Sequence, residues 1–284
     1  MHVIAHGGAG DDPDEPTARQ AVLDEAVEAG IDAETPLDAV IATVRVLEAD
    51  PRFNAGVGGT VQSDGVIRTD AGVMTDDRAV GAACSMPGVE HAVSVAKVVM
   101  EETPHVLVSG EHAVDLAADF GVETDVDLST EDTRARWADL EDRPDDGPAA
   151  HLDWLRERFG GHDTVGAVAT DGDRVAAATS TGGRWLALAG RVGDVPQVGS
   201  GFYAAPAGGA SATGAGEDIA KVTLSRRAVG HLEAGHDAQA AAALAVEEFG
   251  ELTGSTAGVI VVSRNGDLGS AFNSEAMQTA RASR

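Results

Sequence analysis

A pair of apolar segments in the middle of the chain, residues 164–170 and 174–179, constrains the fold more than any other feature. They flank Asp171-Gly172-Asp173, and two runs rich in valine, alanine and threonine around such a turn predict a β-hairpin. The preceding stretch, residues 122–148, is charged and holds few large apolar side chains, which is typical of a flexible linker. Since the strand pattern begins abruptly at Thr164, this threonine is either an ordinary strand residue or a reactive centre.

Helical and extended patterns alternate along the rest of the chain. A helix is expected over 15–29, with Gly30 as its C-cap, and a second helix begins at Pro36. The further helices are expected over 89–102, 111–120, 152–159, 217–232 and 237–249. The further strands are expected over 1–6, 81–86, 105–110, 256–263 and 267–272, with turns at 6–10 and 265–266. A hairpin is also expected over 60–77, around the turn Asp64-Gly65. No repeat of about 20–50 residues is visible, so the pattern indicates a single α+β layered domain over 1–284.

The chain of 284 residues is strongly acidic, with 47 aspartates and glutamates against 20 lysines and arginines and a formal net charge of −27. Binding of duplex nucleic acid through such a surface is disfavoured. Lysine occurs only at Lys97 and Lys221. An acidic, lysine-poor surface is typical of proteins that stay soluble in high salt, so a halophilic source is expected.

The sequence also bears on location. No apolar run reaches the length of a membrane-spanning helix, and the N-terminus lacks the pattern of a secretory signal. A soluble cytoplasmic protein is therefore expected, with no membrane partner. The single cysteine, Cys84, excludes internal disulfides.

Common hydrolase signatures are absent from the sequence. There is no G-x-S-x-G, H-E-x-x-H or G-x-x-x-x-G-K-[ST] segment, and the nine histidines show no metal-ligand spacing. Three glycine-rich turns lie downstream of the hairpin's start, at 179–183, 190–194 and 212–217, and their glycines let backbone N–H groups approach a ligand. In the second turn, Arg191 and Asp194 suit the carboxylate and the ammonium of a zwitterion, although an ordinary surface ion pair is the alternative.

A threonine hydroxyl is a poor nucleophile unless a base removes its proton. No Ser-His-Asp arrangement that would supply a base is visible in the sequence. Cleavage directly before Thr164 would give that residue a free α-amino group with a pKa of about 7.7–8.0, which can serve as its own base. On the local pattern alone, Thr164 is more simply the first residue of a strand.

Eight motifs follow one another along the chain: "HGGAG", "FNAGVGG", "DAGVMTDD", "AACSMPGVEHAVSVAKVVMEETPHVLVSGEHA", "TVGAVA", "TSTGG", "GRVGD" and "TGAGE". In these motifs and their order the chain resembles, over nearly its whole length, the plant-type L-asparaginase/isoaspartyl peptidase family of N-terminal-nucleophile (Ntn) hydrolases. The resemblance implies a four-layer αββα sandwich, the Ntn-hydrolase fold. It also implies a precursor that cleaves itself at Asp163–Thr164 into an α chain of 1–163 and a β chain of 164–284.

The resemblance further implies how such a chain would act. The hydroxyl of Thr164 would attack the side-chain carbonyl of asparagine or of a β-aspartyl dipeptide, with its own α-amino group as the base. Water would then hydrolyse the resulting β-aspartyl enzyme. Thr181 matches a residue that orients the nucleophile, and Asn54 matches one that supports autocleavage and catalysis.

The remaining site residues are also carried by the resemblance. Arg191 and Asp194 match the residues that hold the α-carboxylate and the α-amino group of the substrate. Thr213 and the amide of Gly214 match the oxyanion hole, and Gly216 lines the same pocket.

No cofactor for catalysis is implied, but a structural sodium ion is. Its ligands would be backbone carbonyls of one segment, namely those of Leu47, Glu48, Asp50, Phe53, Ala55 and Val57. A homodimer of αβ units is implied in the same way.

Three positions depart from the family pattern. Asp163 stands where asparaginases of this type usually have glycine, and in this it is closer to the glycosylasparaginases. Ala215 replaces the histidine of "TGHGE", and Ala187 replaces a frequent lysine. A glycosylasparaginase therefore remains the first alternative, and an uncleaved, non-catalytic amino-acid-binding scaffold the second.

Overall fold

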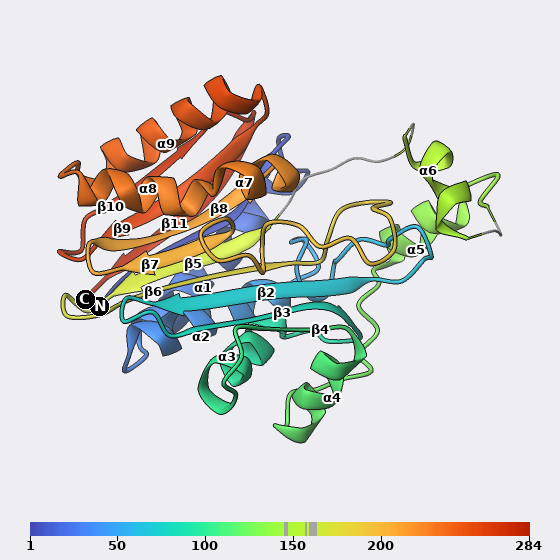
Figure 1. Ribbon diagram of the computed structural model, residues 1–284, viewed down its shortest axis with the longest axis horizontal. Helices are drawn as coiled ribbons and strands as arrows, with labels where there is room; N and C mark the ends of the chain where they lie inside the picture. The colour runs from blue at the N-terminus through green and yellow to red at the C-terminus, as the bar shows by residue number, and fades with distance from the viewer. Residues whose placement is uncertain (145–146, 157, 159–163) are drawn as a thin grey trace.

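The computed structural model describes residues 1–144, 147–156, 158 and 164–284. Two stacked β-sheets form the middle of the molecule (Figure 1). The first sheet has the order β11-β1-β5-β6-β2-β3-β4, with β1 His2–Gly10, β2 Arg68–Thr75, β3 Val80–Pro87, β4 Leu107–Ser109, β5 Val165–Thr170, β6 Val175–Thr181 and β11 Ala276–Ser283. The second has the order β10-β9-β8-β7, with β7 Phe202–Ala205, β8 Gly208–Gly214, β9 Ala257–Ser263 and β10 Leu268–Phe272.

Helices cover the outer face of each sheet (Figure 1). Those over the first sheet are α1 Pro16–Ile31, α2 Pro36–Glu48, α3 Ala92–Glu102 and α4 Glu111–Asp119. Those over the second are α7 Gly216–Val222, α8 Leu224–Glu233 and α9 Ala238–Thr253, while α5 Glu131–Ala138 and α6 Pro148–Arg156 lie to one side. This arrangement confirms the predicted α+β, four-layer αββα sandwich.

The central hairpin of β5 and β6 is buried on both faces, by the second sheet on one side and by helices on the other. Successive side chains of a strand point to opposite sides, so they enter these two layers in turn. Val168 packs between the two sheets with Phe202 of β7, whereas Ala167 and Ala169 pack in the core beneath α1 and α2. The sheets approach so closely that a Cβ atom on Gly72 of β2 would collide with the Phe202 ring. The end of this hairpin at Thr164 therefore lies in the layer between the sheets.

Several local expectations were right and others were wrong. The helix from Pro36, the hairpin of β5 and β6, and the hairpin of β9 and β10 are confirmed. The helix expected over 217–232 is broken at Thr223, whose φ of 53° is left-handed and separates α7 from α8. Gly30 is not the C-cap of α1; it is a helical residue, and Asp32 is the C-cap.

Two loop expectations were also wrong. The glycines after His6 do not end β1, which continues to Gly10 through a register shift between His6 and Ala9. The segment 122–148, expected to lack structure, contains α5, which begins where the Thr130 side chain accepts a hydrogen bond from the amide of Thr133. Its flexibility stays a prediction. Strands β7, β8 and β11 had not been expected, because short alanine- and glycine-rich runs carry a weak strand signal.

Helix α6 begins before the expected 152 and is described to Arg156, while residues 157 and 159 lie outside the described part of the chain. Across the described residues, no helix is both long and apolar enough to span a membrane.

Candidate active site

Thr164 lies directly before β5, in the layer between the two sheets, and is almost fully buried. The register of β5 and β6 pairs Val165 with Ser180, so Thr164 comes next to Thr181. The hydroxyl of Thr164 donates a hydrogen bond to the Thr181 hydroxyl over 3.4 Å, long for an O–H···O bond. The Thr181 hydroxyl in turn accepts the amide of Gly183 at 3.2 Å. The two threonines that the sequence analysis named are therefore brought together.

His6 forms a buried polar chain beneath this pair that the sequence analysis did not identify. Its Nε2 lies 2.9 Å from the Ser211 hydroxyl, which lies 2.6 Å from the Thr179 hydroxyl, and Thr179 donates to the carbonyl of Gly201 at 2.8 Å. Burial lowers the pKa of His6 to about 3 and outweighs a hydrogen bond to the Thr164 backbone. His6 is therefore neutral near pH 7 and too weak a base to activate a hydroxyl.

Within the described residues, no carboxylate or imidazole forms a hydrogen bond with the hydroxyl of Thr164. A base for this hydroxyl must therefore come from another source. The signal that could have revealed His6 was its place as the first residue of "HGGAG", a segment interpreted as a turn and as a family motif, with no role given to the histidine.

Thr213 and Gly214 end β8 on the opposite side of the inter-sheet layer. Thr213 is fully buried, and its hydroxyl accepts the amide of Ala9 in β1 at 3.2 Å. Gly214 has a φ of 133°, and a Cβ atom there would lie 2.6 Å from the Cα of Ala257. Only glycine fits at this position, because a side chain would be strained and would clash with β9.

Arg191, Asp194 and Gly216 also come together. A Cβ atom on Gly216 would lie 2.5 Å from Asp194 Oδ1 and 2.9 Å from Arg191 Nη2, so the glycine allows both charged groups to reach one point. Asp194 is only 5% exposed, and its Oδ2 atom has no hydrogen-bond partner among the described residues. Burial raises the pKa of Asp194 to about 7, although the positive charge of Arg191 opposes this rise.

Glu217, which the sequence analysis missed, connects this pair to a second arginine. Its Oε1 accepts Arg191 Nε at 2.8 Å, and its Oε2 lies 3.4 Å from Arg184 Nη1. Although burial opposes ionisation, the hydrogen bond and the charge of Arg191 hold the pKa of Glu217 below its usual range. Glu217 therefore stays ionised and fixes the orientation of the Arg191 guanidinium. The signal was its place as the last residue of "TGAGE".

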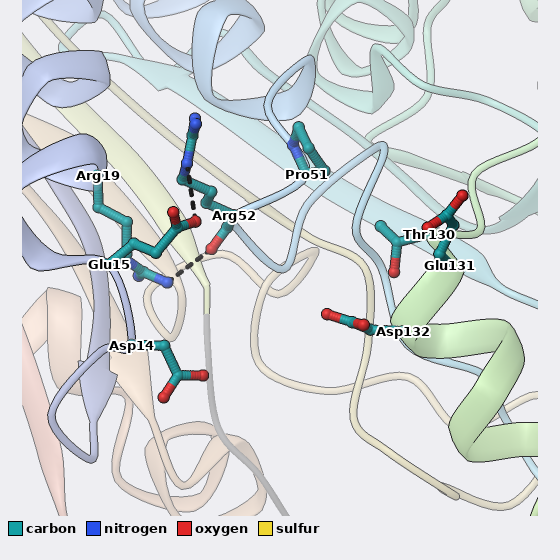
Figure 2. A pocket seen from close by; sticks show the side chains of 8 residues that line it. All are labelled: Asp14, Glu15, Arg19, Pro51, Arg52, Thr130, Glu131 and Asp132. Carbon is teal, nitrogen blue, oxygen red and sulfur yellow. Dashed lines mark hydrogen bonds and ion pairs between the residues drawn. The ribbon is translucent and has the colours of Figure 1, made fainter.

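Asn54 fastens the loop after α2 to the end of β6. Its side-chain Nδ2 donates to the backbone carbonyl of Gly183 at 2.6 Å, and its backbone carbonyl accepts the amide of Gly182 at 2.8 Å. On the other side, Arg19 of α1 binds the backbone carbonyl of Arg52 at 2.6 Å (Figure 2). It also binds the backbone carbonyl of Gly7 at 2.7 Å. The loop is thus held against both β6 and β1, close to Thr181.

In the loop of residues 47–57, some backbone carbonyl oxygens lie close to the glycines that end it. The carbonyls of Pro51 and Phe53 lie 2.7 Å or less from the point where a Cβ atom of Gly58 would sit. The carbonyls of Glu48 and Asp50 each accept a backbone N–H, from Val57 and Phe53, but a carbonyl has a second lone pair. The described residues contain no cluster of three or more His, Cys, Asp or Glu side chains suited to a metal. The oxygen-only donor set fits a hard cation such as sodium.

The side chain of Glu48 strengthens the same region. It is fully buried, and its Oε1 accepts the Ser180 hydroxyl at 2.6 Å and the amide of Val93 at 2.9 Å. The carboxylate therefore connects α2 to β6 one residue before Thr181. From the sequence, only the backbone carbonyl of Glu48 was expected to have a role.

Of the other predicted positions, Asp163 lies outside the described residues. Ala187 is fully buried, and Ala215 is the N-cap of α7. The expected residues thus fall into two groups, Thr164 with Thr181 and Asn54, and Arg191 with Asp194 and Gly216, while Thr213 faces β1.

Two helix layers enclose two sheets, a threonine precedes a central strand, and a buried carboxyl group lies beside an arginine. These features define a protein of the αββα class with a buried hydroxyl and a charged pair in its candidate site. The sequence pattern that defines the asparaginase family matches residues 1–284 of this chain. The chain therefore belongs to the asparaginase family.

The chain is similar to named members of that family. It is 40% identical to the "Plant-type L-asparaginase" of Pyrococcus abyssi, over 98% of this chain and 95% of the relative. It is 40% identical to the protein of that name from Pyrobaculum calidifontis, over 97% and 94%. It is 38% identical to the "Isoaspartyl peptidase/L-asparaginase" of Danio rerio, over 99% and 91%. These similarities extend over both the region before Thr164 and the region after it.

Proposed function

We propose that this protein is an autoprocessing amidohydrolase that converts L-asparagine to aspartate and ammonia and also hydrolyses β-aspartyl dipeptides. One observation carries the proposal: a buried carboxylate, Asp194, has an oxygen without a partner beside Arg191. A buried acceptor of this kind is costly unless a ligand satisfies it. The α-ammonium and α-carboxylate of an aspartyl group would satisfy Asp194 and Arg191 together. The names of the relatives support the same substrates over a glycosylated asparagine or a non-catalytic scaffold.

The first reaction is cleavage of the chain at Asp163–Thr164. The Thr164 hydroxyl adds to the carbonyl carbon of Asp163, the C–N bond breaks, and the proton of the hydroxyl passes to the released nitrogen. Water then hydrolyses the ester, which leaves the carboxylate of Asp163 and a free amino group on Thr164. Because His6 is neutral and a weak base, this amino group is the base for the next reaction.

Substrate hydrolysis follows the same pattern. The amino group of Thr164 takes the hydroxyl proton while the oxygen attacks the side-chain carbonyl of the substrate. The hydroxyl of Thr213 and the amide of Gly214 stabilise the oxyanion. Ammonia or an amino acid leaves with the proton, and water hydrolyses the β-aspartyl ester to release aspartate. Thr181 orients the Thr164 hydroxyl, and Gly216 leaves room for the bound α-groups.

The remaining parts of the proposal concern support and setting. Asn54 holds the loop after α2 against Gly182 and Gly183. The carbonyls of 47–57 would hold a sodium ion, whose contribution is to fix this loop. By family resemblance, the protein acts as a homodimer of αβ units in the cytoplasm. Its acidic, lysine-poor composition suits a halophilic source.

Replacement of the nucleophile tests this function. Thr164→Ala should stay a single chain of 28.8 kDa and release no ammonia from asparagine. The unaltered protein should give a fragment with the mass of residues 164–284, which begins at Thr164. Thr103→Ala, which removes a hydroxyl at the end of α3, is the matched control and should cleave normally. Asparagine hydrolysis by Thr164→Ala would reject the proposed nucleophile.

A further inference from the structure

Arg191 and Asp194 lie on a long loop between β6 and β7. The structure describes every residue of this loop, and none of them belongs to a helix or to a strand of either sheet. Backbone N–H and C=O groups that no helix or strand pairs need other partners when they are removed from water. The position of Arg191 therefore depends on what holds this loop.

The turn of residues 61–67 lies against the loop. The amide of Leu186 donates to the backbone carbonyl of Val61 at 2.9 Å, and the amide of Ser63 donates to the backbone carbonyl of Ala187 at 2.8 Å. These two bonds hold the turn beside the first part of the loop, so side chains of the turn can bind the residues that follow.

The side chain of Gln62 binds the backbone of the loop at Arg191 itself. Its Oε1 accepts the amide of Gly190 at 2.8 Å, and its Nε2 donates to the backbone carbonyl of Arg191 at 3.3 Å. Gln62 is only 2% exposed, so water competes little for these bonds. Because an unpaired buried amide costs folding free energy, the glutamine and the loop hold each other in one arrangement.

Arg68 fixes the orientation of this amide. Its Nη1 donates to Gln62 Oε1 at 2.9 Å, and the same guanidinium binds the two carboxylate oxygens of Asp64 at 3.0 Å and 2.8 Å. The amide oxygen of Gln62 thus faces two donors, while its nitrogen faces a carbonyl, and each atom has the kind of partner that it requires. A flipped amide would set its NH2 group against the arginine, so Gln62 has one orientation.

We propose that Gln62 is a positioning residue for substrate binding, which holds the backbone of Arg191 so that its guanidinium meets the α-carboxylate of the substrate. Glu217 holds the guanidinium at 2.8 Å, so the two ends of Arg191 are fixed separately. A loop that is ordered before binding does not lose that freedom when the substrate arrives. The inference rests on the proposed function and adds a residue that sets its affinity.

Replacement of Gln62 by methionine, which has a similar length and no amide, tests the proposal. We expect KM for asparagine to rise roughly tenfold, the effect of one lost hydrogen bond, with kcat and cleavage before Thr164 unchanged. Gln239→Met is the matched control, because Gln239 also bonds one amide and one carbonyl, both of Ser270, at 3.2 Å and 2.9 Å. These bonds join α9 to β10, and their loss should leave KM unaltered.

Amide hydrogen exchange gives a second measurement, which does not depend on activity. In Gln62→Met the Gly190 amide loses its acceptor, so a peptide containing residues 187–193 should exchange faster than in the unaltered protein or in Gln239→Met. If Gln62→Met does not fold, Gln62→Glu replaces it. Glutamate keeps the acceptor for Gly190 but sets an oxygen against the Arg191 carbonyl, so KM should still rise.

The outcomes are distinguishable. An unchanged KM in the folded Gln62 variant would overturn the inference. A fall in kcat with no rise in KM would also overturn it, because Gln62 would then support the chemical step and not substrate binding. Failure of the proposed function would appear in the unaltered protein itself, which would release no ammonia from asparagine.

Discussion

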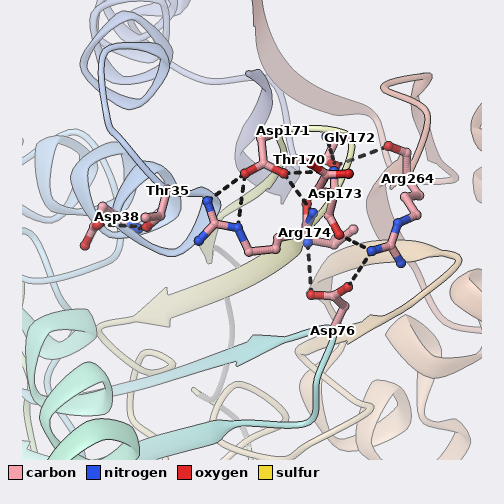
Figure 3. A network of polar contacts seen from close by, with 10 residues as sticks. Thr35, Asp38, Asp76, Thr170, Asp171, Gly172, Asp173, Arg174 and Arg264 are labelled. Atoms are coloured by element: carbon pink, nitrogen blue, oxygen red, sulfur yellow. Dashed lines mark hydrogen bonds and ion pairs between the residues drawn. The ribbon is translucent and has the colours of Figure 1, made fainter.

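The two ends of the β5–β6 hairpin differ in how their polar groups are satisfied. At the turn end, Asp171 binds Arg174 at 2.8 Å and accepts the amides of Asp173 and Arg174, while Asp76 accepts the amide of Val175 (Figure 3). At the open end, Thr164 and Thr181 are joined by a long hydrogen bond, and the Asp194 Oδ2 nearby has no partner among the described residues.

This difference separates stability from function. A partly exposed ion-pair network at a turn stabilises the turn, and its polar groups are paired without a ligand. A buried carboxylate with a raised pKa and an unused oxygen costs folding free energy, which is the arrangement expected where a substrate will bind. The turn belongs to the hairpin and Asp194 to the segment that follows β6, so the contrast can be tested by changing one residue at a time.

Asp194→Asn should have the largest effect. The amide keeps the shape but removes the charge that would pair with the substrate's ammonium, and loss of a charged hydrogen bond of about 2–3 kcal/mol corresponds to roughly a 30–150-fold rise in KM for asparagine. Steady-state kinetics on asparagine measure this directly. A KM within threefold of the original value would contradict the assignment of Asp194.

The same substitution should change two pH profiles. Ionised Asp194 binds an ammonium, and its pKa is about 7 before substrate binds, so KM should fall as pH rises from 6 to 8. Because the folded pKa is raised above its ordinary value, this group favours folding below about pH 4, and its contribution is lost as pH rises toward 7. Asp194→Asn should remove both effects. Thermal unfolding at pH 5 and pH 8 measures the second.

Gly166→Ala tests the buried chain beneath the nucleophile. A Cβ atom there would clash with the Ser211 hydroxyl and lie 2.6 Å from His6 Nε2, and overpacking of this kind costs about 1–3 kcal/mol. We expect a lower denaturation midpoint together with slower cleavage at Thr164. Gly172→Ala, at the turn end of the same hairpin, has open space around it but a φ of 94°. That control should lose stability and cleave at the normal rate.

Arg174→Gln should have the smallest effect. Its guanidinium is half exposed and pairs with Asp171, and such pairs contribute about 0.2–1 kcal/mol. Chemical denaturation should show a change of that size, with KM for asparagine unaltered. A large loss of activity would show instead that the two ends of the hairpin are coupled.

Much of the site could be predicted because short, ordered motifs carry it. Thr164, Thr181, Arg191 and Asp194 were all named from the sequence, and the structure brings them into two adjacent groups. His6, Glu217 and the role of the Glu48 side chain were missed, since each side chain acts through partners distant in sequence. His6 and Ser211 are 205 positions apart, and Glu48 and Ser180 are 132 apart. No local pattern encodes such pairings.

The sequence by itself determined the layered α+β class and the β5–β6 hairpin, because these depend on the spacing of apolar residues and on turn chemistry within a few positions. It also contains the reactive motifs in their order. Only the tertiary structure decided which charges are buried and which partner each one has. The folded chain removes Asp194 and His6 from water and sets Glu217 between two arginines. Burial and distance set the strength of electrostatic interactions, and neither is visible until the chain has folded.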